Sequence, residues 1–157
     1  MTVIQTFAEF SAACEPPAEA MAAARTCLLD WYGGALAGSV EMPATGLRRA
    51  LVGTGAARLL PDDAPADPRT AALINGTASH TVEVDDIFRE GLYHPGVVTI
   101  PAALAAGQLA GCSGTRLTLA IVAGYEVGNR IARAVNPAHY QHWHTTATVG
   151  HFGNARD

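Results

Sequence analysis

Histidines and carboxylates are concentrated in two short stretches of the sequence. The first, residues 80–96, reads HTVEVDDIFREGLYHPG, and the second, residues 139–151, contains four of the six histidines. Only 15% of the chain is Asp, Glu, Lys or Arg, so this density is unusual for it. Because the charge of histidine changes near neutral pH, histidine is a common general acid or base. Two histidine-bearing loops at the ends of packed helices could face each other across a cleft.

Two other interpretations of the same stretches stay open. His142 and His144 form an H-x-H pair that could bind a metal together with the carboxylates of residues 83–86, as in a metal-dependent hydrolase. The spacing matches no specific zinc or iron motif. Alternatively, the charged stretch is a solvated helix end with local ion pairs, in which exposed Arg89 pairs with Glu90.

Helices are predicted to position both stretches. Apolar residues recur at helical spacing in five segments, residues 18–37, 43–53, 69–82, 101–111 and 116–135. The last residues of the chain, HWHTTATVGHFGNARD, read as the beginning of another helix. No segment alternates with period two for long. The predicted fold is therefore all-α, a helical bundle-like domain, with PDDAPADP (61–68) as a surface loop.

Particular small residues and prolines refine these predictions. Pro101 is expected in the first turn of its helix, where a missing N–H costs little. Gly76, inside a predicted helix, suggests close backbone contact with a neighbour. A stripe of small residues would let another helix approach closely, and it comprises Ala120, Gly124 and Gly128.

Composition excludes several classes of partner. The net charge is −4, all ten basic residues are Arg, and no basic run occurs, so nucleic acid and anionic membrane are not expected partners. The N-terminal residues lack the basic region of a secretory signal, and no apolar run is long enough to span a membrane. Three cysteines are too few and too scattered for a disulfide framework or a metal knuckle. A reduced, cytoplasmic location is expected.

Several short motifs occur in an order and at spacings that are typical of one enzyme family. They are Asn75-Gly76, His80, Glu83-Val84-Asp85-Asp86, His94-Pro95-Gly96, Pro101-Ala102-Ala103-Leu104, Gly124-Tyr125-Glu126 with Arg130, and Trp143-His144-x-Thr146 with Gly150 and Gly153. This series resembles the MmgE/PrpD family, which includes 2-methylcitrate dehydratase, cis-aconitate decarboxylase and iminodisuccinate epimerase. The resemblance covers nearly the whole chain from about residue 18.

The resemblance implies an enzyme that acts on a small di- or tricarboxylate without metal or organic cofactor, and that forms a homodimer. It implies a helical domain followed by an α+β lid, so residues 1–157 would be an incomplete helical domain. The family's D-x-D-D segment matches residues 83–86, and its two site histidines match His94 and His144. Arg89 is a candidate substrate clamp.

The chain also departs from the family pattern. Glu83 stands where the family usually has Asp, Ile87 where a hydroxyl residue is common, and His142 where Gly is frequent. The family also places a Lys and the lid further along, whereas this chain contains no Lys. The substrate therefore cannot be copied from a named member.

The sequence thus leads to two hypotheses. In the first, the chain is the N-terminal part of a cofactor-independent lyase or isomerase, most similar to 2-methylcitrate dehydratase. In this hypothesis His94 and His144 transfer protons. The substrate is bound by Glu83, Asp85, Asp86 and Arg89, and no metal takes part. Protonated histidine can offset charge that builds on the carboxylate. In the second, the chain is an inactive helical remnant that binds a partner or self-associates.

Overall fold

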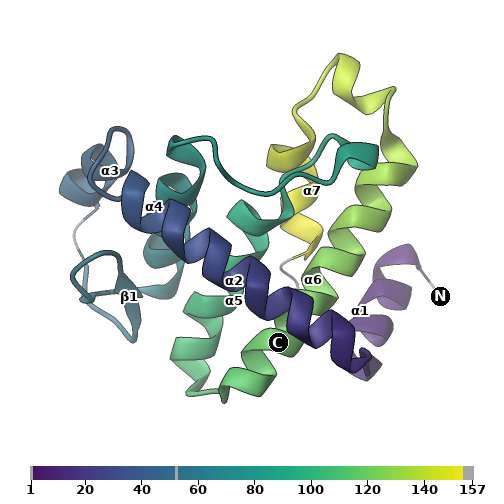
Figure 1. Ribbon diagram of the computed structural model, residues 1–157, viewed down its shortest axis with the longest axis horizontal. Helices are drawn as coiled ribbons and strands as arrows, with labels where there is room; N and C mark the ends of the chain where they lie inside the picture. The colour runs from purple at the N-terminus through teal and green to yellow at the C-terminus, as the bar shows by residue number, and fades with distance from the viewer. Residues whose placement is uncertain (1, 52, 154–157) are drawn as a thin grey trace.

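The computed structural model describes residues 2–51 and 53–153. Its α-helices are α1 (Val3–Ala13), α2 (Ala18–Gly38), α3 (Ala44–Ala50), α4 (Pro68–Thr81), α5 (Pro95–Ala110), α6 (Gly114–Val135) and α7 (Thr145–Gly153). Two 3-10 turns, η1 (Arg89–Gly91) and η2 (His139–Gln141), and one hairpin of β1 (Ala57–Leu59) and β2 (Ala64–Ala66) complete it (Figure 1). The all-α prediction is confirmed. Among the helices of the described residues, none is long and apolar enough to cross a bilayer.

Side-chain caps explain where several helices begin. Asp67 accepts hydrogen bonds from the backbone N–H groups of Arg69 and Thr70. Hydrogen bonding by Thr70, through its side chain and its N–H, is the main reason that the pKa of the Asp67 carboxyl group is lowered. Ser113 caps α6 in the same way, by accepting from the N–H of Arg116. Each cap satisfies an N–H that has no partner inside its helix. The start of α4 therefore falls within one residue of the predicted segment.

The fifth helix begins earlier than the sequence predicts. Instead of starting at Pro101, α5 starts at Pro95 and carries Pro101 in its interior. Its first turn is fixed by Asp86, which accepts a hydrogen bond from the N–H of Gly96. Pro101 lacks the N–H that would bond the carbonyl oxygen of Val97, and this usually breaks a helix. Tertiary packing overrides that preference, because Pro101 lies buried against α4.

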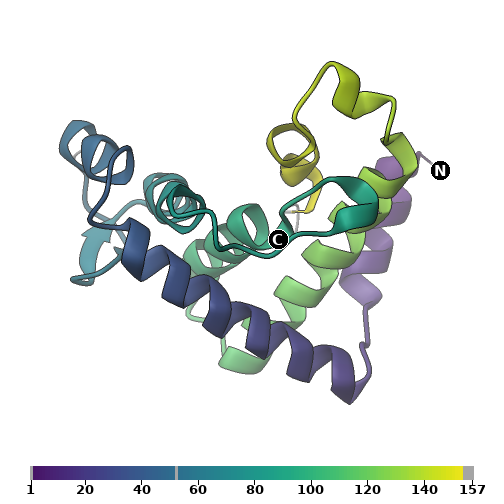
Figure 2. The same cartoon turned by 45° about the horizontal axis from the view of Figure 1, so that its top comes forward.

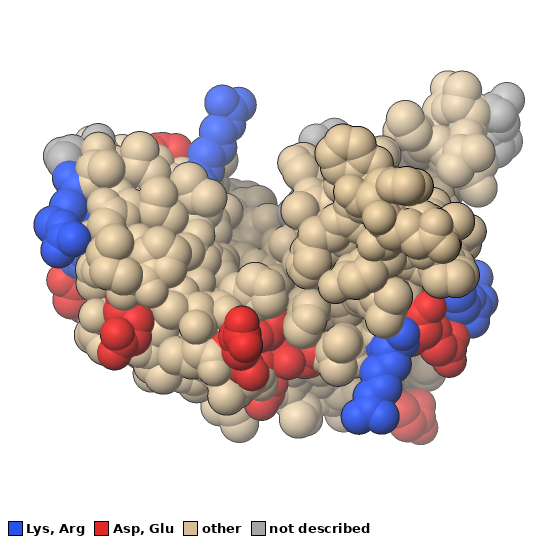
Figure 3. All heavy atoms as spheres, turned by 90° about the horizontal axis from the view of Figure 1, so that it is seen from above, with Lys and Arg blue, Asp and Glu red and all other residues tan. Residues whose placement is uncertain are grey.

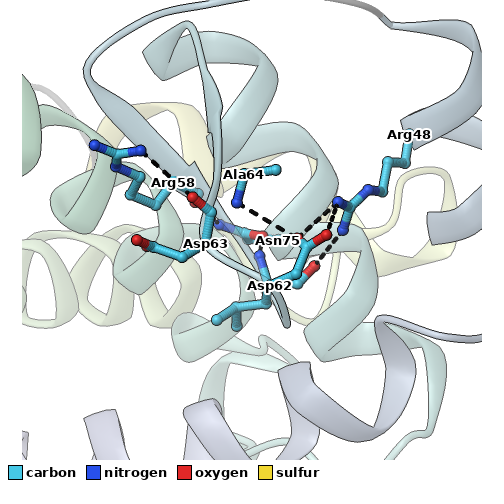
Figure 4. Close-up of polar contacts among 7 residues, drawn as sticks. Arg48, Arg58, Asp62, Asp63, Ala64 and Asn75 are labelled. Carbon is cyan, nitrogen blue, oxygen red and sulfur yellow. Dashed lines mark hydrogen bonds and ion pairs between the residues drawn. The ribbon is translucent and has the colours of Figure 1, made fainter.

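The predicted loop 61–68 is in part the second strand of the hairpin. Ala57 pairs with Ala66 in antiparallel register. The buried amide of Asn75 on α4 holds this hairpin, because its Oδ1 accepts from the N–H of Leu60 and its Nδ2 donates to the carbonyl of Arg58 (Figure 4). Strands of three residues are too short to show a period-two pattern, so the loop prediction is wrong for residues 64–66.

The turn of the hairpin is tied to the neighbouring helix by an ion pair. Arg48 on α3 donates from Nη2 to both carboxylate oxygens of Asp62 and from Nη1 to the carbonyl of Leu60 (Figure 4). This contact lowers the pKa of the Asp62 carboxyl group. Figure 4 also shows Arg58 reaching the carbonyl oxygen of Asp63. These polar contacts fix the hairpin at the α3 and α4 end of the molecule.

The helix α5 lies at the centre of the fold. It packs against α2, α4, α6 and α7, and Figure 2 shows it between the teal α4 and the yellow α7. The central apolar cluster is formed by Trp31 of α2, Ile100 of α5 and Ile121 of α6, with Ala24 and Ala35. Two further clusters flank it. One joins the hairpin to α4 and α5, and the other joins the residues on either side of η1 to α6 and α7.

Glycines allow the closest approaches between elements. A Cβ on Gly76 would lie 2.9 Å from the carbonyl oxygen of Val97, so the predicted close contact is present, between α4 and α5. A Cβ on Gly128 would lie 2.7 Å from the hydroxyl oxygen of Tyr93. At Gly128 the small-residue stripe therefore accommodates the fully buried ring of Tyr93 rather than another helix.

Candidate active site

A pocket of about 770 Å³ opens between α4 and α7, over α5. In Figure 3 it corresponds to the hollow between the lobe with α3 and α4 and the lobe with α7. Its apolar floor comes from α5, including Val97, Val98 and Pro101. Its polar lining residues are Thr77, His80, Thr81, Glu83, His144, Thr146 and His151. The volume suits a small molecule, for which protein pockets commonly measure about 300–1,000 Å³.

The α4 wall of the pocket contains a carboxylate between two imidazoles. Asp85 Oδ2 lies 3.0 Å from Nδ1 of His80 and 2.7 Å from Nδ1 of His94. The two rings are 5.1 Å apart between centroids. Asp85 has only 5% of its side chain exposed, against 40% for His80 and 25% for His94. A buried carboxylate in this position can orient both rings and stabilise a positive charge on either.

Asp86 is turned away from these imidazoles and into the protein. Its Oδ1 accepts from the N–H of Gly96 at 3.0 Å, and its Oδ2 accepts from the hydroxyl of Tyr125 at 2.8 Å. Burial raises the pKa of the Asp86 carboxyl group above its usual value despite these hydrogen bonds. Burial likewise raises the pKa of Tyr125 and of the neighbouring thiol of Cys27. Asp86 thus anchors the residues that follow His94.

The opposite wall begins at His144, which is exposed and directly precedes α7. Its carbonyl oxygen accepts from the N–H of Ala147 at 3.1 Å, and its ring lies 5.8 Å from that of Tyr140 between centroids. Two residues later, Thr146 Oγ1 accepts a hydrogen bond from the backbone N–H of His94 at 3.1 Å. This bond ties the two histidine-bearing stretches together.

Among the described residues, His80, Asp85 and His94 each offer one donor atom, and these three atoms lie within 4.8 Å of one another. Two imidazoles and one carboxylate can bind a divalent transition metal. These three residues differ from the metal ligands considered from the sequence, which included the H-x-H pair. His142 of that pair is exposed and is not among the described residues that line the pocket.

Comparison with known proteins is consistent with these motifs. The MmgE/PrpD N-terminal domain matches residues 3–156. The chain belongs to the MmgE/PrpD family. A cis-aconitate decarboxylase-like protein of Aspergillus oryzae is 30% identical over 92 residues, which are 53% of this chain and 19% of that protein. Cis-aconitate decarboxylase of Aspergillus terreus is 29% identical over 103 residues, 61% of this chain and 21% of that enzyme. The matched regions span about a fifth of these relatives.

The family motifs converge in space, although not all of the predicted site residues line the pocket. Glu83 does, and its φ of 52° is uncommon for a residue with a side chain, as found at some functional sites. Asp85 and His94 lie in the wall behind His80. Arg89 is exposed and outside the described lining, and Glu90 faces Arg133, 3.6 Å away, rather than Arg89.

Sequence reasoning missed two histidines of this MmgE/PrpD pocket. The sequence alone places His80 only in the family series and does not assign His151 to the site. Helical spacing could have identified His80. Gly76 and Thr77 precede it by four and three residues, so all three lie on one face of α4, and all three line the pocket. His151 lies on the α7 face that also carries Ala147.

Proposed function

We propose that this MmgE/PrpD protein is a lyase or isomerase that acts on a small di- or tricarboxylate by histidine-mediated proton transfer, without a metal or an organic cofactor. One observation supports it most: a single pocket with an apolar floor carries histidines on two walls. His80, which shares Asp85 with His94, lines one wall, and His144 lines the other.

The chemistry needs groups on more than one side of the substrate. Removal of a proton beside a carboxylate requires a base, and loss of a hydroxyl group or protonation of a carbanion requires an acid. Histidines on two walls can divide these tasks. Protonated imidazoles would also offset substrate charge, a role that matters because none of the pocket-lining residues in the described part of the chain is Arg.

The relatives favour decarboxylation over the dehydration expected from the sequence, since they are named for cis-aconitate decarboxylase. The assay described below distinguishes dehydratase, decarboxylase and epimerase activity. The homodimer, the cytoplasmic location and a longer native enzyme with a lid also stay predictions.

The test is an assay of the native protein with cis-aconitate, 2-methylcitrate and iminodisuccinate in D₂O, followed by NMR. We expect turnover or C–H exchange of at least one compound, and a fall of about 100-fold or more in His144→Ala, as is usual for a general acid or base. His142→Ala is the matched control, because His142 is an exposed histidine nearby that does not line the pocket. Equal rates in the two variants would contradict the role of His144.

The rival function is a non-catalytic helical domain that binds a partner. Exposed apolar side chains such as Leu29, Val40 and Trp143 favour it. It predicts that the wild type neither turns over nor exchanges any of the three compounds. Exposed apolar side chains would also contact further segments of a longer enzyme, so they fit both functions. The assay is what separates the two functions.

A further inference from the structure

The geometry points to His80 as the residue on the α4 wall that exchanges a proton with the substrate, with Asp85 as the residue that positions it. This inference rests on the proposed function, and it selects between the two imidazoles that contact Asp85. His94 then lies behind the reacting group rather than against the substrate.

The two imidazoles differ in their access to the pocket. His80 lines the pocket, and 40% of its side chain is exposed. His94 is not among the described lining residues, and 25% of its side chain is exposed. A residue that transfers a proton to a substrate carbon must come within hydrogen-bond reach of it. Of the two rings, His80 meets this condition in the pocket as it stands.

The two imidazoles also differ in their contact with Asp85. His80 Nδ1 and Asp85 Oδ2 form one, at 3.0 Å. His94 Nδ1 is closer, at 2.7 Å, but among the described residues it has no partner with hydrogen-bond geometry. Asp85 therefore fixes the orientation of the His80 ring more directly than that of the His94 ring.

The hydrogen bond also determines which nitrogen of His80 can react. An ionised carboxylate only accepts hydrogen bonds, so the proton of neutral His80 must reside on Nδ1. The lone pair then resides on Nε2, the nitrogen that remains available to a ligand. The position of His80 in the last turn of α4 is also favourable for a transient positive charge, because the carbonyl end of a helix attracts cations.

The proposed step is a balanced proton transfer. Nε2 of His80 takes a proton from the substrate carbon next to a carboxylate, so a C–H bond breaks and an N–H bond forms. The electron pair remains on the substrate as an enediolate, and the imidazolium faces Asp85. Where loss of CO₂ leaves a carbanion, the reverse transfer takes place: protonated His80 gives its Nε2 proton to the carbon.

Two measurements test this inference. Histidine ¹⁵N NMR of the native protein should show His80 protonated on Nδ1 and unprotonated on Nε2 when neutral, and tricarballylate, a saturated tricarboxylate, should shift Nε2 of His80 more than that of His94. In the assay, His80→Gln should lower kcat about 100-fold or more, with KM changed only a few-fold. Added imidazole should restore part of the rate to His80→Ala, which a purely structural role would not allow. His142→Gln is the control.

The outcomes separate this inference from the function on which it rests. A wild type without turnover or exchange contradicts the proposed function, and the NMR experiment then decides the assignment of His80. A proton on Nε2 of neutral His80, or a tricarballylate response at His94 but not at His80, overturns the assignment. Full activity in His80→Gln also overturns it. So does tight binding of Zn²⁺ or Mn²⁺ that broadens or shifts both imidazoles, because that result makes the three donors a metal site.

Discussion

At the residue scale, two adjacent carboxylates have different surroundings and different tasks. Asp85 contacts two imidazoles, whereas Asp86 accepts a backbone N–H at the start of α5 and the hydroxyl of Tyr125. Both residues lie in the irregular segment that follows α4, where the two side chains reach different partners. Asp85 is therefore placed to orient a reacting group, and Asp86 to hold the first turn of the helix that follows His94.

Asp86 should make stability depend on pH in a predictable direction. Burial raises the pKa of its carboxyl group above the ordinary value of 3.8. The protonated form is thus favoured in the folded state, so this contribution to stability is complete below pH 3.8 and is lost as pH rises through the raised pKa. Asp86→Asn, which cannot ionise, should remove this loss. Urea unfolding at several pH values should show the free energy of unfolding of Asp86→Asn gaining on that of the wild type as pH rises from 3.8.

The comparison isolates Asp86, because the other carboxylates titrate in both proteins and cancel in the difference. Asp67→Asn is a useful contrast, since hydrogen bonds lower the pKa of the carboxyl group of that helix cap. There the wild type should gain on the variant as pH rises through the acid range. A constant difference between the wild type and Asp86→Asn at all pH values would show that the folded protein does not disfavour the ionised carboxylate.

At the element scale, the pocket depends on how closely α4 and α5 approach. A Cβ on Gly76 would lie 2.9 Å from the carbonyl oxygen of Val97 and 3.3 Å from Cγ of Pro101. Gly76→Ala should therefore force the helices apart and lower the free energy of unfolding by about 1–3 kcal/mol, the usual cost of overpacking. Urea unfolding measures this loss. Activity should fall as well, because Gly76 lines the pocket.

Gly33→Ala is the matched control, because Gly33 lies within a helix and a Cβ there would meet no atom within 4 Å. Alanine forms helices better than glycine by about 1 kcal/mol, so this variant should be as stable as the wild type or more stable. If Gly76→Ala were stabilised to the same extent, the contact between α4 and α5 would be looser than the structure has it.

The elements that sequence predicted well are those whose signal is local. α2, α4 and α6 follow from apolar spacing, and their starts follow from Pro17, Asp67 and Ser113. The hairpin and the first turn of α5 could not be found in this way. The hairpin depends on the amide of Asn75, and the start of α5 depends on Asp86, ten residues before Gly96. Such tertiary contacts leave no periodic trace in the sequence.

The candidate site shows the same division. The family motifs identified the two histidine-bearing stretches, but the motif order alone did not show that His80 faces the pocket while Arg89 points elsewhere. That distinction depends on the turn after α4, where Glu83 adopts a positive φ that few residues with a side chain adopt. A glutamate has little intrinsic preference for this conformation, so the direction of the chain after α4 was not predictable.

At the scale of the whole molecule, the two walls of the pocket belong to different apolar clusters. The α4 wall is supported by the cluster that contains the hairpin, and the α7 wall by the cluster of Tyr93, Ala132 and Val149. The two clusters are joined through α5, which packs against both α4 and α7. The distance between the histidines of the two walls is therefore maintained only if α7 folds together with the rest of the chain.

This coupling can be measured with one buried reporter. Trp31 is 4% exposed in the central cluster, away from α7, and in a Trp143→Phe background it is the only tryptophan. Val149→Ala removes two buried carbons from α7 and should cost about 1–3 kcal/mol, from about 0.8 kcal/mol per methylene plus a cavity term. If the molecule unfolds as one unit, the Trp31 fluorescence transition moves by the full amount and coincides with the loss of helical circular dichroism.

Val40→Ala, at a valine that is 65% exposed, should change the midpoint little. A Trp31 transition unmoved by Val149→Ala would mean that α7 folds on its own, and a pocket with histidines on two walls would then require a further element to hold them at a fixed distance.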